Sequence, residues 1–189
     1  MQQSLSNMEI PFSSSMIIHT SRYLFDQHGF HNVGVDRISK ESNVSKMTFY
    51  KYFKSKEKLI ELCLEFHQET LMQQVSSILS ANLKSQNLDK LKEIYFLHAD
   101  LKSHYHLIFK AIFEIQKIYP QAHRVVIKYR EWLINIILEI LLNIKSNASI
   151  EEARLLIYII DSSIIQSLIN DEIDHREYIW SYFSSKISL

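Results

Sequence analysis

The sequence predicts an all-α fold of about nine helices, in which an N-terminal helix-turn-helix unit precedes a larger helical body. The 189 residues include only two Gly and two Pro, so helix breakers are scarce and long helices are expected. Residues 24–59 also have the pattern of three short helices, and only a tight turn separates the last two. This is the arrangement of a helix-turn-helix.

The first helices follow from apolar spacing and from residues that suit helix ends. A stripe from Ile17 to Phe25 recurs at helical spacing, and Gly29 suits a left-handed helix end because it has no Cβ. Residues 35–42 give a second helix of about two turns. Asn43 follows, and Asn tolerates a left-handed backbone.

The third helix begins after Ser45, which is a preferred helix cap. Phe49 and Phe53 are four residues apart and face inward. Ser55 caps a fourth helix with a long apolar face. The side chains of the third helix that point away from the core form the candidate reading surface: Lys46, Met47, Tyr50 and Lys51.

The remaining chain reads as helices joined by short polar links, and Ser149-x-x-Glu152 forms a capping box before one of them. The predicted helices are 12–28, 35–42, 46–52, 56–81, 88–101, 103–117, 121–146, 150–171 and 175–187. We divide the chain into an N-terminal helix-turn-helix domain, 1–55, and a larger helical domain, 56–189.

Charge is unevenly distributed although the formal net charge is zero. Residues 35–58 hold seven basic and three acidic side chains, a net charge of +4. By itself such a run is a solvated surface. On a helix-turn-helix it favours a polyanionic partner.

These residues resemble the TetR-type transcriptional regulators. The resemblance rests on Leu24-Phe25, Gly29-Phe30, Ile38, Val44-Ser45, Thr48-Phe49-Tyr50, Tyr52-Phe53 and Lys56-Glu57-x-Leu59. It covers about a quarter of the chain. It implies an all-helical homodimer with paired helix-turn-helix units on an inverted-repeat operator, and repression that a small molecule relieves.

The sequence departs from that family pattern at four positions. Gly34 stands where the family has Ser or Thr to cap the second helix and touch phosphate, so one backbone contact is expected to be weaker. Ser39, Ser42 and Asn43 replace the usual Ala, Ala and Gly.

The helix that enters the major groove presents its first residues to base edges. Lys46 can donate to guanine and Met47 can pack on a thymine methyl. Tyr50, Tyr52 and Lys56 are expected to hold the backbone, although both tyrosines could instead be core residues. The full set of predicted DNA-binding residues is Val35, Arg37, Ser45, Lys46, Met47, Thr48, Tyr50, Lys51, Tyr52 and Lys56.

Residues 155–160 are six consecutive apolar side chains, which cover every face of the eighth helix. A dimer interface accounts for them, and a buried central helix in a monomer is the alternative. The residues predicted for the interface are Leu156, Ile160, Ile164, Leu168, Ile179 and Phe183.

The middle helices are rich in aromatic residues, which favours an apolar or aromatic effector of unknown identity. The residues predicted to line its pocket are Tyr95, His98, His106, Tyr129 and Trp132.

Other classes of protein fit less well. The cluster of His98, His104 and His106 would suit a metal sensor by composition. On a helix, however, the two rings of His-x-His point to different sides and cannot readily chelate one ion. Cys63 lacks a second cysteine for a redox switch. No phosphate loop or nucleophile elbow indicates an enzyme. A non-DNA-binding interaction protein or co-regulator with the same fold is the main alternative.

The prediction is therefore a protein without metal or cofactor. No apolar segment is long enough to span a membrane. The lone Cys63 fits a reducing cytoplasm.

Overall fold

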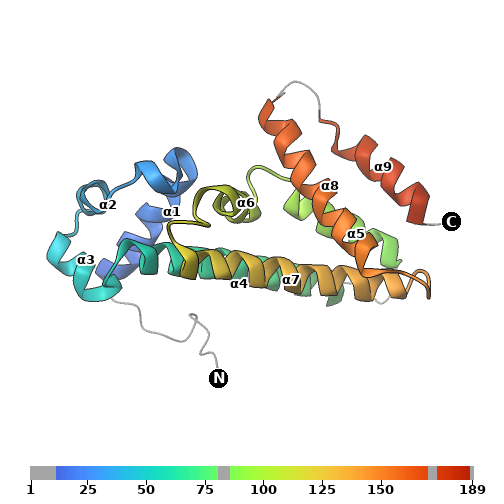
Figure 1. Ribbon diagram of the computed structural model, residues 1–189, viewed down its shortest axis with the longest axis horizontal. Coiled ribbons are helices and arrows are strands. Elements are labelled where there is room, and N and C mark those ends of the chain that lie inside the picture. Colours follow the sequence, from blue (N-terminus) through green and yellow to red (C-terminus); the bar gives the residue numbers. More distant parts are fainter. Residues whose placement is uncertain (1–11, 81–85, 170–173, 188–189) are drawn as a thin grey trace. The chain divides into compact units, whose positions relative to one another are not determined.

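A computed structural model describes residues 12–80, 86–169 and 174–187, and every described element is an α-helix (Figure 1). This agrees with the predicted all-α fold. The nine helices in these ranges are α1 (Phe12–Asn32), α2 (Val35–Glu41), α3 (Lys46–Phe53), α4 (Lys56–Ser80), α5 (Asn87–His98), α6 (Tyr105–Glu114), α7 (Pro120–Leu142), α8 (Ile150–Ile169) and α9 (Arg176–Ile187).

The chain forms two compact units, and neither is continuous in sequence. Unit 1 comprises residues 1–69 and 107–126, and unit 2 comprises residues 70–106 and 127–189. Helices α4, α6 and α7 each contribute residues to both units. The predicted domains divide the chain once, at residue 55. The two units are instead defined by contacts between residues, so each combines two separate segments of the chain.

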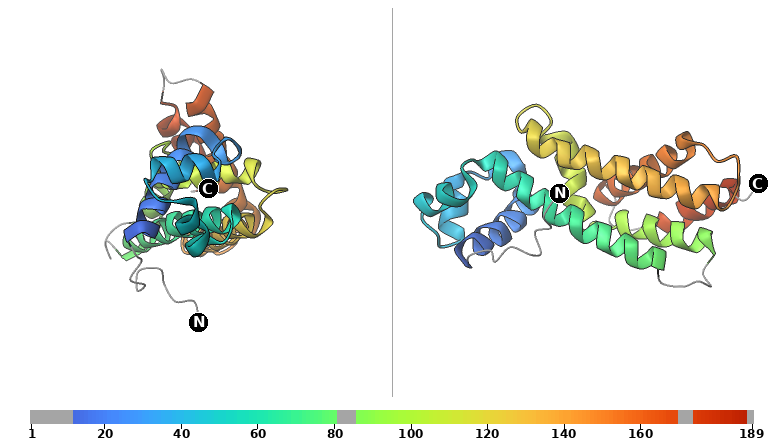
Figure 2. Two further views of the ribbon diagram at one scale, coloured as in Figure 1. Left: turned by 90° about the vertical axis from the view of Figure 1, so that its left-hand side faces the viewer. Right: turned by 90° about the horizontal axis from the view of Figure 1, so that it is seen from below.

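Unit 1 contains the helix-turn-helix. Helices α1, α2 and α3 contact one another and form one cluster in Figures 1 and 2. Its core is built from side chains that are fully buried, among them Phe25, Phe30, Ile38 and Phe49. The rings of Phe25 and Phe30 stack at 5.1 Å, and those of Phe49 and Phe53 lie 5.5 Å apart. The inward face predicted for α3 is therefore confirmed.

In unit 2, α5, α8 and α9 pack against one another (Figure 1). Leu91 and Ile94 of α5, Leu156 and Ile160 of α8, and Trp180 of α9 are buried in this core. The capping box predicted before α8 is present. Its reciprocal bonds run from the Ser149 N–H to Glu152 Oε2 at 2.9 Å and from the Glu152 N–H to Ser149 Oγ at 3.3 Å.

Several predicted helices end earlier in the structure. The helices expected to reach residues 101, 117 and 146 end at His98, Glu114 and Leu142. The Ala99 N–H still bonds to Tyr95, but the next residues turn. After Leu142 the backbone forms tighter bonds, including one from the Ile144 N–H to the Leu141 carbonyl. Helix ends lack the apolar spacing that locates helix middles. The predicted ends at 81 and 171 lie outside the described residues.

Helix α1 breaks at Gly29, where φ is 77° and ψ is 164°. A positive φ was predicted there because Gly accepts it without strain. A Cβ at this position would lie 2.8 Å from Glu114 Oε2, so the carboxylate occupies the space that a side chain would need. Gly29 is thus required both by its backbone conformation and by a close approach from α6.

Two charged side chains of opposite sign bind the polar backbone groups of Phe30, and we call this arrangement the Phe30 clamp. The Phe30 N–H donates to Glu114 Oε2 at 2.7 Å, and Lys56 Nζ donates to the Phe30 carbonyl at 2.6 Å. The helix break leaves these groups without their usual intrahelical partners. The clamp therefore fixes the end of α1 against α6 and α4 within unit 1.

None of the described helices combines the length and the apolar character that crossing a membrane requires.

The link between α3 and α4 is a single strained turn. Lys54 has φ 63° and ψ −38°, and the Ser55 N–H donates to the Phe53 carbonyl at 2.7 Å. An i to i+2 bond around a residue with positive φ is the rare, strained form of the γ-turn. A lysine in this conformation stores strain that a glycine would not.

Replacing Lys54 with Gly is therefore expected to raise the free energy of unfolding by about 0.5–1 kcal/mol. The measurement is urea unfolding followed by circular dichroism. Lys51→Gly is the matched control, because Lys51 is exposed within α3, and this change should lower the free energy of unfolding by about 1 kcal/mol. Equal destabilisation by the two changes would contradict strain at Lys54.

Candidate functional site

The outward face of α3 is exposed as the apolar spacing predicts. Met47 is 83% exposed, and Tyr50 is 49% exposed while the edge of its ring packs on Phe49 at 5.2 Å. Lys46 at the start of the helix is also exposed, and its Nζ lies 2.7 Å from Asp36 Oδ1 of α2. This surface ion pair is weak, so Lys46 can exchange Asp36 for another acceptor.

Ser45 and Thr48 fix the start of α3. Ser45 Oγ accepts a hydrogen bond from the Thr48 N–H at 3.1 Å, which is the predicted cap, and lies 2.9 Å from Thr48 Oγ1. The turn before the cap contains Asn43 at φ 53°, as predicted for a left-handed residue. The two hydroxyl groups therefore hold each other at the N-terminus of the recognition helix.

Helix α2 begins without a side-chain cap. Gly34 occupies the cap position in extended conformation, and a Cβ added there would meet no atom within 4 Å. Val35 is half-buried beside it. Arg37 is held from two sides, since its Nε donates to Glu41 at 2.6 Å and its Nη2 contacts His28 Nε2 at 2.7 Å.

The remaining predicted DNA-binding residues lie toward the end of α3 and the start of α4. Lys51 is exposed, and its Nζ lies 5.6 Å from the centre of the Tyr52 ring. Tyr52 is half-buried and contacts Phe53. Lys56 belongs to the Phe30 clamp and lies 5.3 Å from the Tyr119 ring. Lys56 therefore has a structural role whether or not it contacts phosphate.

Three of the predicted effector residues form one cluster in unit 2. His98 and Tyr129 stack with ring centroids 6.0 Å apart, and Trp132 lies 5.6 Å from Tyr129. Tyr95 is also buried but bonds elsewhere, with its hydroxyl 2.8 Å from Ser163 Oγ. His106 is half-buried near the start of α6.

The bonding of His98 defines its tautomer. His98 Nδ1 lies 2.7 Å from the Ile94 carbonyl, which can only accept, so Nδ1 carries the proton. Nε2 therefore accepts from the Tyr129 hydroxyl at 2.6 Å. Burial lowers the pKa of His98 to about 4. The imidazole is consequently neutral and fully bonded in the native protein.

Sequence reasoning missed a second polar group beside this cluster. Asp161 binds Arg130 through a pair of bonds, with Arg130 Nη2 2.7 Å from Asp161 Oδ2, and accepts from the Tyr105 hydroxyl at 3.0 Å. The side chains of Arg130 and Asp161 are only 16% and 18% exposed. The available signal was the single charge of Asp161 within an otherwise uncharged stretch of α8.

The residues predicted for a dimer interface divide into two groups. Leu156, Ile160 and Ile164 are fully buried within a single chain, and Phe183 is only 6% exposed. These side chains already pack in the subunit core, so they offer no surface to a partner. Leu168 is 55% exposed and Ile179 is half-buried.

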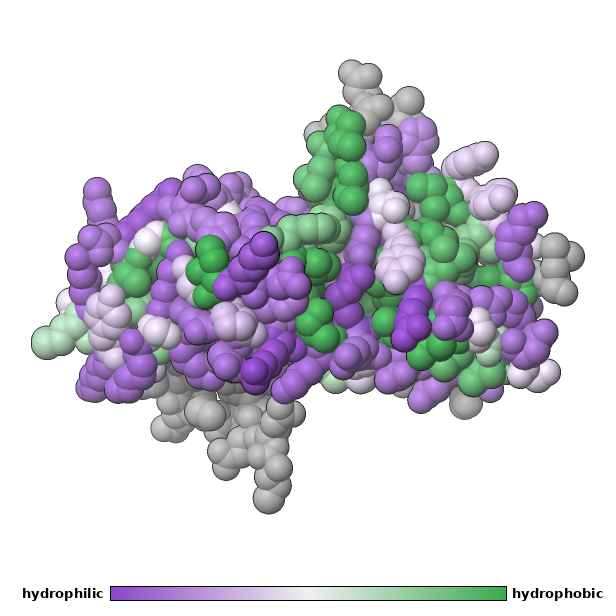
Figure 3. Space-filling model, in the orientation of Figure 1, coloured by the Kyte–Doolittle hydropathy of each residue, from purple (hydrophilic) through white to green (hydrophobic). Residues whose placement is uncertain are grey.

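A different face of α8 and α9 is apolar and exposed, and we call it the α8–α9 face. Figure 3 shows apolar side chains reaching the surface toward the C-terminal end of α8. Positions 155, 158, 165 and 169 recur at helical spacing. The face consists of Leu155, Tyr158, Ile165, Leu168, Ile169, Tyr178 and Tyr182, which are 43–75% exposed.

Redox and metal chemistry find little support among the described residues. Cys63 is buried, and burial raises its pKa to about 12, so the thiol is protonated and unreactive at neutral pH. Within residues 12–80, 86–169 and 174–187, no three His, Cys, Asp or Glu side chains gather as a metal would need.

Comparison with known proteins identifies the N-terminal region. Residues 17–63 match the family described as "Bacterial regulatory proteins, tetR family". The uncharacterised HTH-type transcriptional regulator YuxN of Bacillus subtilis (strain 168) is 36% identical over 63 residues, which are 33% of this chain. The aligned region spans only 22% of that relative's length.

Similar solved structures cover nearly the whole chain. The TetR-family transcriptional regulator SCO4454 from Streptomyces coelicolor has a TM-score of 0.78 at 21% identity, over 93% of this chain and 92% of that one. The transcriptional regulator FadR from Bacillus subtilis, in complex with stearoyl-CoA, has a TM-score of 0.69 at 19% identity, over 90% and 97%. At these identities the likeness shows the fold alone.

Residues 17–63 therefore have the DNA-binding region of the TetR family, and the fold of the whole chain is similar to that of TetR-family regulators. The resemblance seen in the sequence is therefore confirmed. The family comprises regulatory proteins and not enzymes, in agreement with the prediction.

The neutral state of His98 predicts an acid-sensitive fold. The unfolded chain binds a proton at His98 near pH 6.5, whereas the folded chain binds it only near pH 4. Acid therefore favours unfolding through this site, and between pH 7 and pH 4.5 the stability should fall by about 2–3 kcal/mol from His98 alone. Urea unfolding of the wild type and His98→Gln at both pH values measures this contribution. A pH difference that persists unchanged in the variant would contradict it.

Proposed function

We propose that this protein is a ligand-responsive transcriptional regulator that binds a palindromic operator as a homodimer. It acts in the cytoplasm as a repressor, and a small apolar or aromatic effector releases it from DNA. The observation that carries the proposal is the exposed outer face of α3, where Lys46 and Met47 project into solvent and Tyr50 is half exposed beside them.

The chemistry of that face suits a major groove. Lys46 can give up its exposed partner Asp36 for a guanine acceptor, and Met47 can contact a thymine methyl. Lys51 and Thr48 flank these positions and suit phosphate oxygens. Arg37 and Lys56 already make hydrogen bonds within unit 1. We therefore assign them mainly to positioning the helices and only secondarily to contacting the DNA backbone.

The effector proposal rests on the aromatic cluster of unit 2. His98 and Tyr129 are buried and bonded to each other, so an effector must displace side chains to enter the cluster. A ligand that prefers the displaced arrangement shifts the population of conformers. Because α4, α6 and α7 run through both units, a rearrangement in unit 2 has a continuous path to the helix-turn-helix.

The α8–α9 face supports a homodimer, and it replaces the buried face that the sequence favoured. Exposed apolar side chains that recur along one side of a helix are characteristic of interaction surfaces. A two-fold dimer would place the same face of each subunit against its copy. It would also match two half-sites of an inverted repeat.

The division of roles on α3 can be tested with operator variants. Lys46→Ala should weaken operator binding about tenfold and relax specificity at one base pair. Lys51→Ala should weaken binding to every variant alike and lower the salt slope by about one. The matched control is Lys40→Ala on the exposed side of α2. Binding titrations at several salt concentrations measure both effects. Loss of specificity at the same base pair in all three variants would contradict these roles.

The dimer interface can be tested by adding a charge. Ile165→Glu should weaken dimerisation by at least about 100-fold, because a carboxylate without a partner would be buried against the second subunit. Phe113→Glu is the control, since Phe113 is 69% exposed in unit 1 and lies outside the α8–α9 face. Sedimentation equilibrium measures the change. A dimer that persists in Ile165→Glu would contradict the proposed face.

The proposal as a whole is tested by a footprint on the DNA that flanks the gene, with excess competitor DNA. A protected two-fold site is expected. The second candidate is an interaction protein or co-regulator that retains the fold without binding DNA. Salt-dependent binding to a duplex separates the two, because contact with phosphates releases counterions. Absence of any salt-dependent binding would favour the second candidate.

A further inference from the structure

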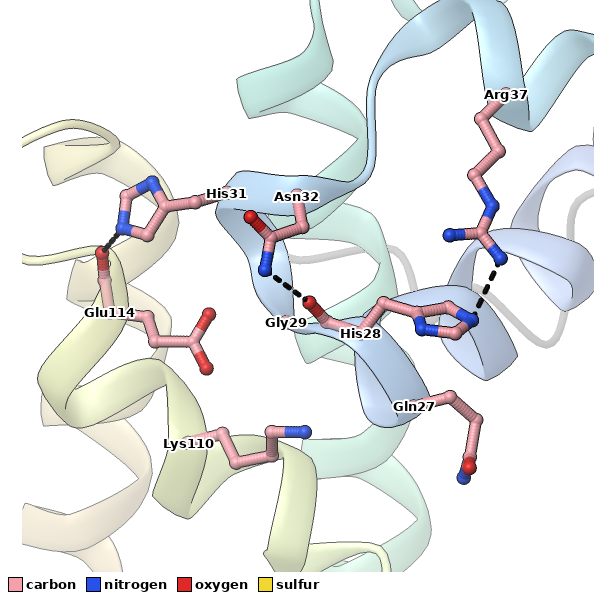
Figure 4. A pocket seen from close by; sticks show the side chains of 8 residues that line it. All are labelled: Gln27, His28, Gly29, His31, Asn32, Arg37, Lys110 and Glu114. Atoms are coloured by element: carbon pink, nitrogen blue, oxygen red, sulfur yellow. Dashed lines mark hydrogen bonds between the residues drawn. The ribbon is translucent and has the colours of Figure 1, made fainter.

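Unit 1 contains a polar pocket that lies outside both the aromatic cluster and the outer face of α3. Its volume is about 700 Å³, within the range of small-molecule sites. The pocket lies where α1 unwinds around Gly29, between α2 and α6, and Figure 4 shows its side chains. Arg37 approaches from the side of α2, and Lys110 from the side of α6.

The lining offers many more hydrogen-bond donors than acceptors. Arg37 has five N–H groups, of which Glu41 and His28 engage only part. Lys110 donates to the Asp26 carbonyl and carries three N–H groups in all. His28 accepts from Arg37 through Nε2, so its remaining proton is on Nδ1. A ligand rich in acceptor oxygens therefore complements the pocket.

Glu114 is the one acidic side chain in the lining, and one of its oxygens is already hydrogen-bonded. Its Oε2 accepts the Phe30 N–H at 2.7 Å, and its backbone carbonyl bonds to His31. Arg37 and Lys110 are the two permanent cations of the lining and Glu114 is its one carboxylate, while Glu41 outside the lining pairs with Arg37 Nε at 2.6 Å. The pocket therefore favours an anion through its surplus of N–H donors and not through a net positive charge.

We propose that this pocket binds the phosphate group of a small molecule, held between Arg37 on α2 and Lys110 on α6. An Arg fork and a Lys ammonium from two walls suit the tetrahedral oxygens of a phosphate. The volume exceeds that of one phosphate, so an organic group can be attached. The site is distinct from the proposed effector core and operator surface.

A ligand in the pocket would connect α2 directly to α6, whereas the Phe30 clamp connects α6 only to the end of α1. Arg37 belongs to the helix-turn-helix and Lys110 to α6, and both lie in unit 1. A phosphate bonded to both would hold α2 against α6. Occupancy would thereby stabilise one arrangement of the helix-turn-helix, which is a second input separate from the aromatic cluster.

The test is a titration of the full-length protein with inorganic phosphate, followed by calorimetry and by the unfolding temperature, at fixed ionic strength against chloride. No DNA is present, so the result does not depend on the proposed operator. Saturable binding is expected in the wild type. Lys110→Gln should weaken it about tenfold, because one charge-assisted hydrogen bond is lost. Lys117→Gln, an exposed lysine outside the pocket, should bind as the wild type does.

Glu114→Gln distinguishes a binding site from a purely structural cluster. The amide oxygen can still accept the Phe30 N–H, while the negative charge in the pocket is lost. Phosphate binding should therefore become several-fold tighter, opposite to the effect of Lys110→Gln. Absence of saturable binding in the wild type, or weakening in both variants, would overturn the proposal.

A duplex of mixed sequence tests whether DNA itself supplies the phosphate. If the pocket serves a free small molecule, Lys110→Gln leaves the salt slope of duplex binding unchanged. A slope lowered by about one, with phosphate competing against DNA, would overturn the small-molecule source and assign the site to the DNA backbone.

Discussion

The Phe30 clamp is the constraint on which the arrangement of unit 1 depends. When α1 unwinds at Gly29, the polar backbone groups of Phe30 lose their helical partners. A carboxylate from α6 accepts the N–H, and an ammonium from α4 donates to the carbonyl. Charged partners make these bonds stronger than neutral ones. The clamp therefore stabilises the break in α1 and fixes Glu114 at the wall of the polar pocket.

In unit 2, by contrast, polar groups are buried among aromatic rings. His98 stays neutral and bonds to both Ile94 and Tyr129, while Arg130 and Asp161 neutralise each other beside Tyr105. A buried network of this kind is costly when partly broken. An effector that entered it, as proposed, would have to supply replacement bonds.

The sequence predicted the helix-turn-helix well because its signals are local. Ser45 and Ser149 bind backbone groups three residues away, and Asn43 and Gly29 show the positive φ expected of their types. Helix ends beyond His98 and Leu142 were extended too far, since polar turns carry no periodic signal. The strained turn at Lys54 had no signal at all, because lysine does not favour positive φ.

By itself, the sequence determined the all-α fold, the recognition helix and the identity of its exposed side chains, because helical spacing decides which residues share a face. Only the tertiary structure decided which face of α8 turns inward, since residues 155–160 are apolar all round. It also paired Phe30 with Glu114, 84 residues apart, and Arg130 with Asp161, 31 residues apart. Contacts at such separations depend on how the helices pack, which no local pattern records.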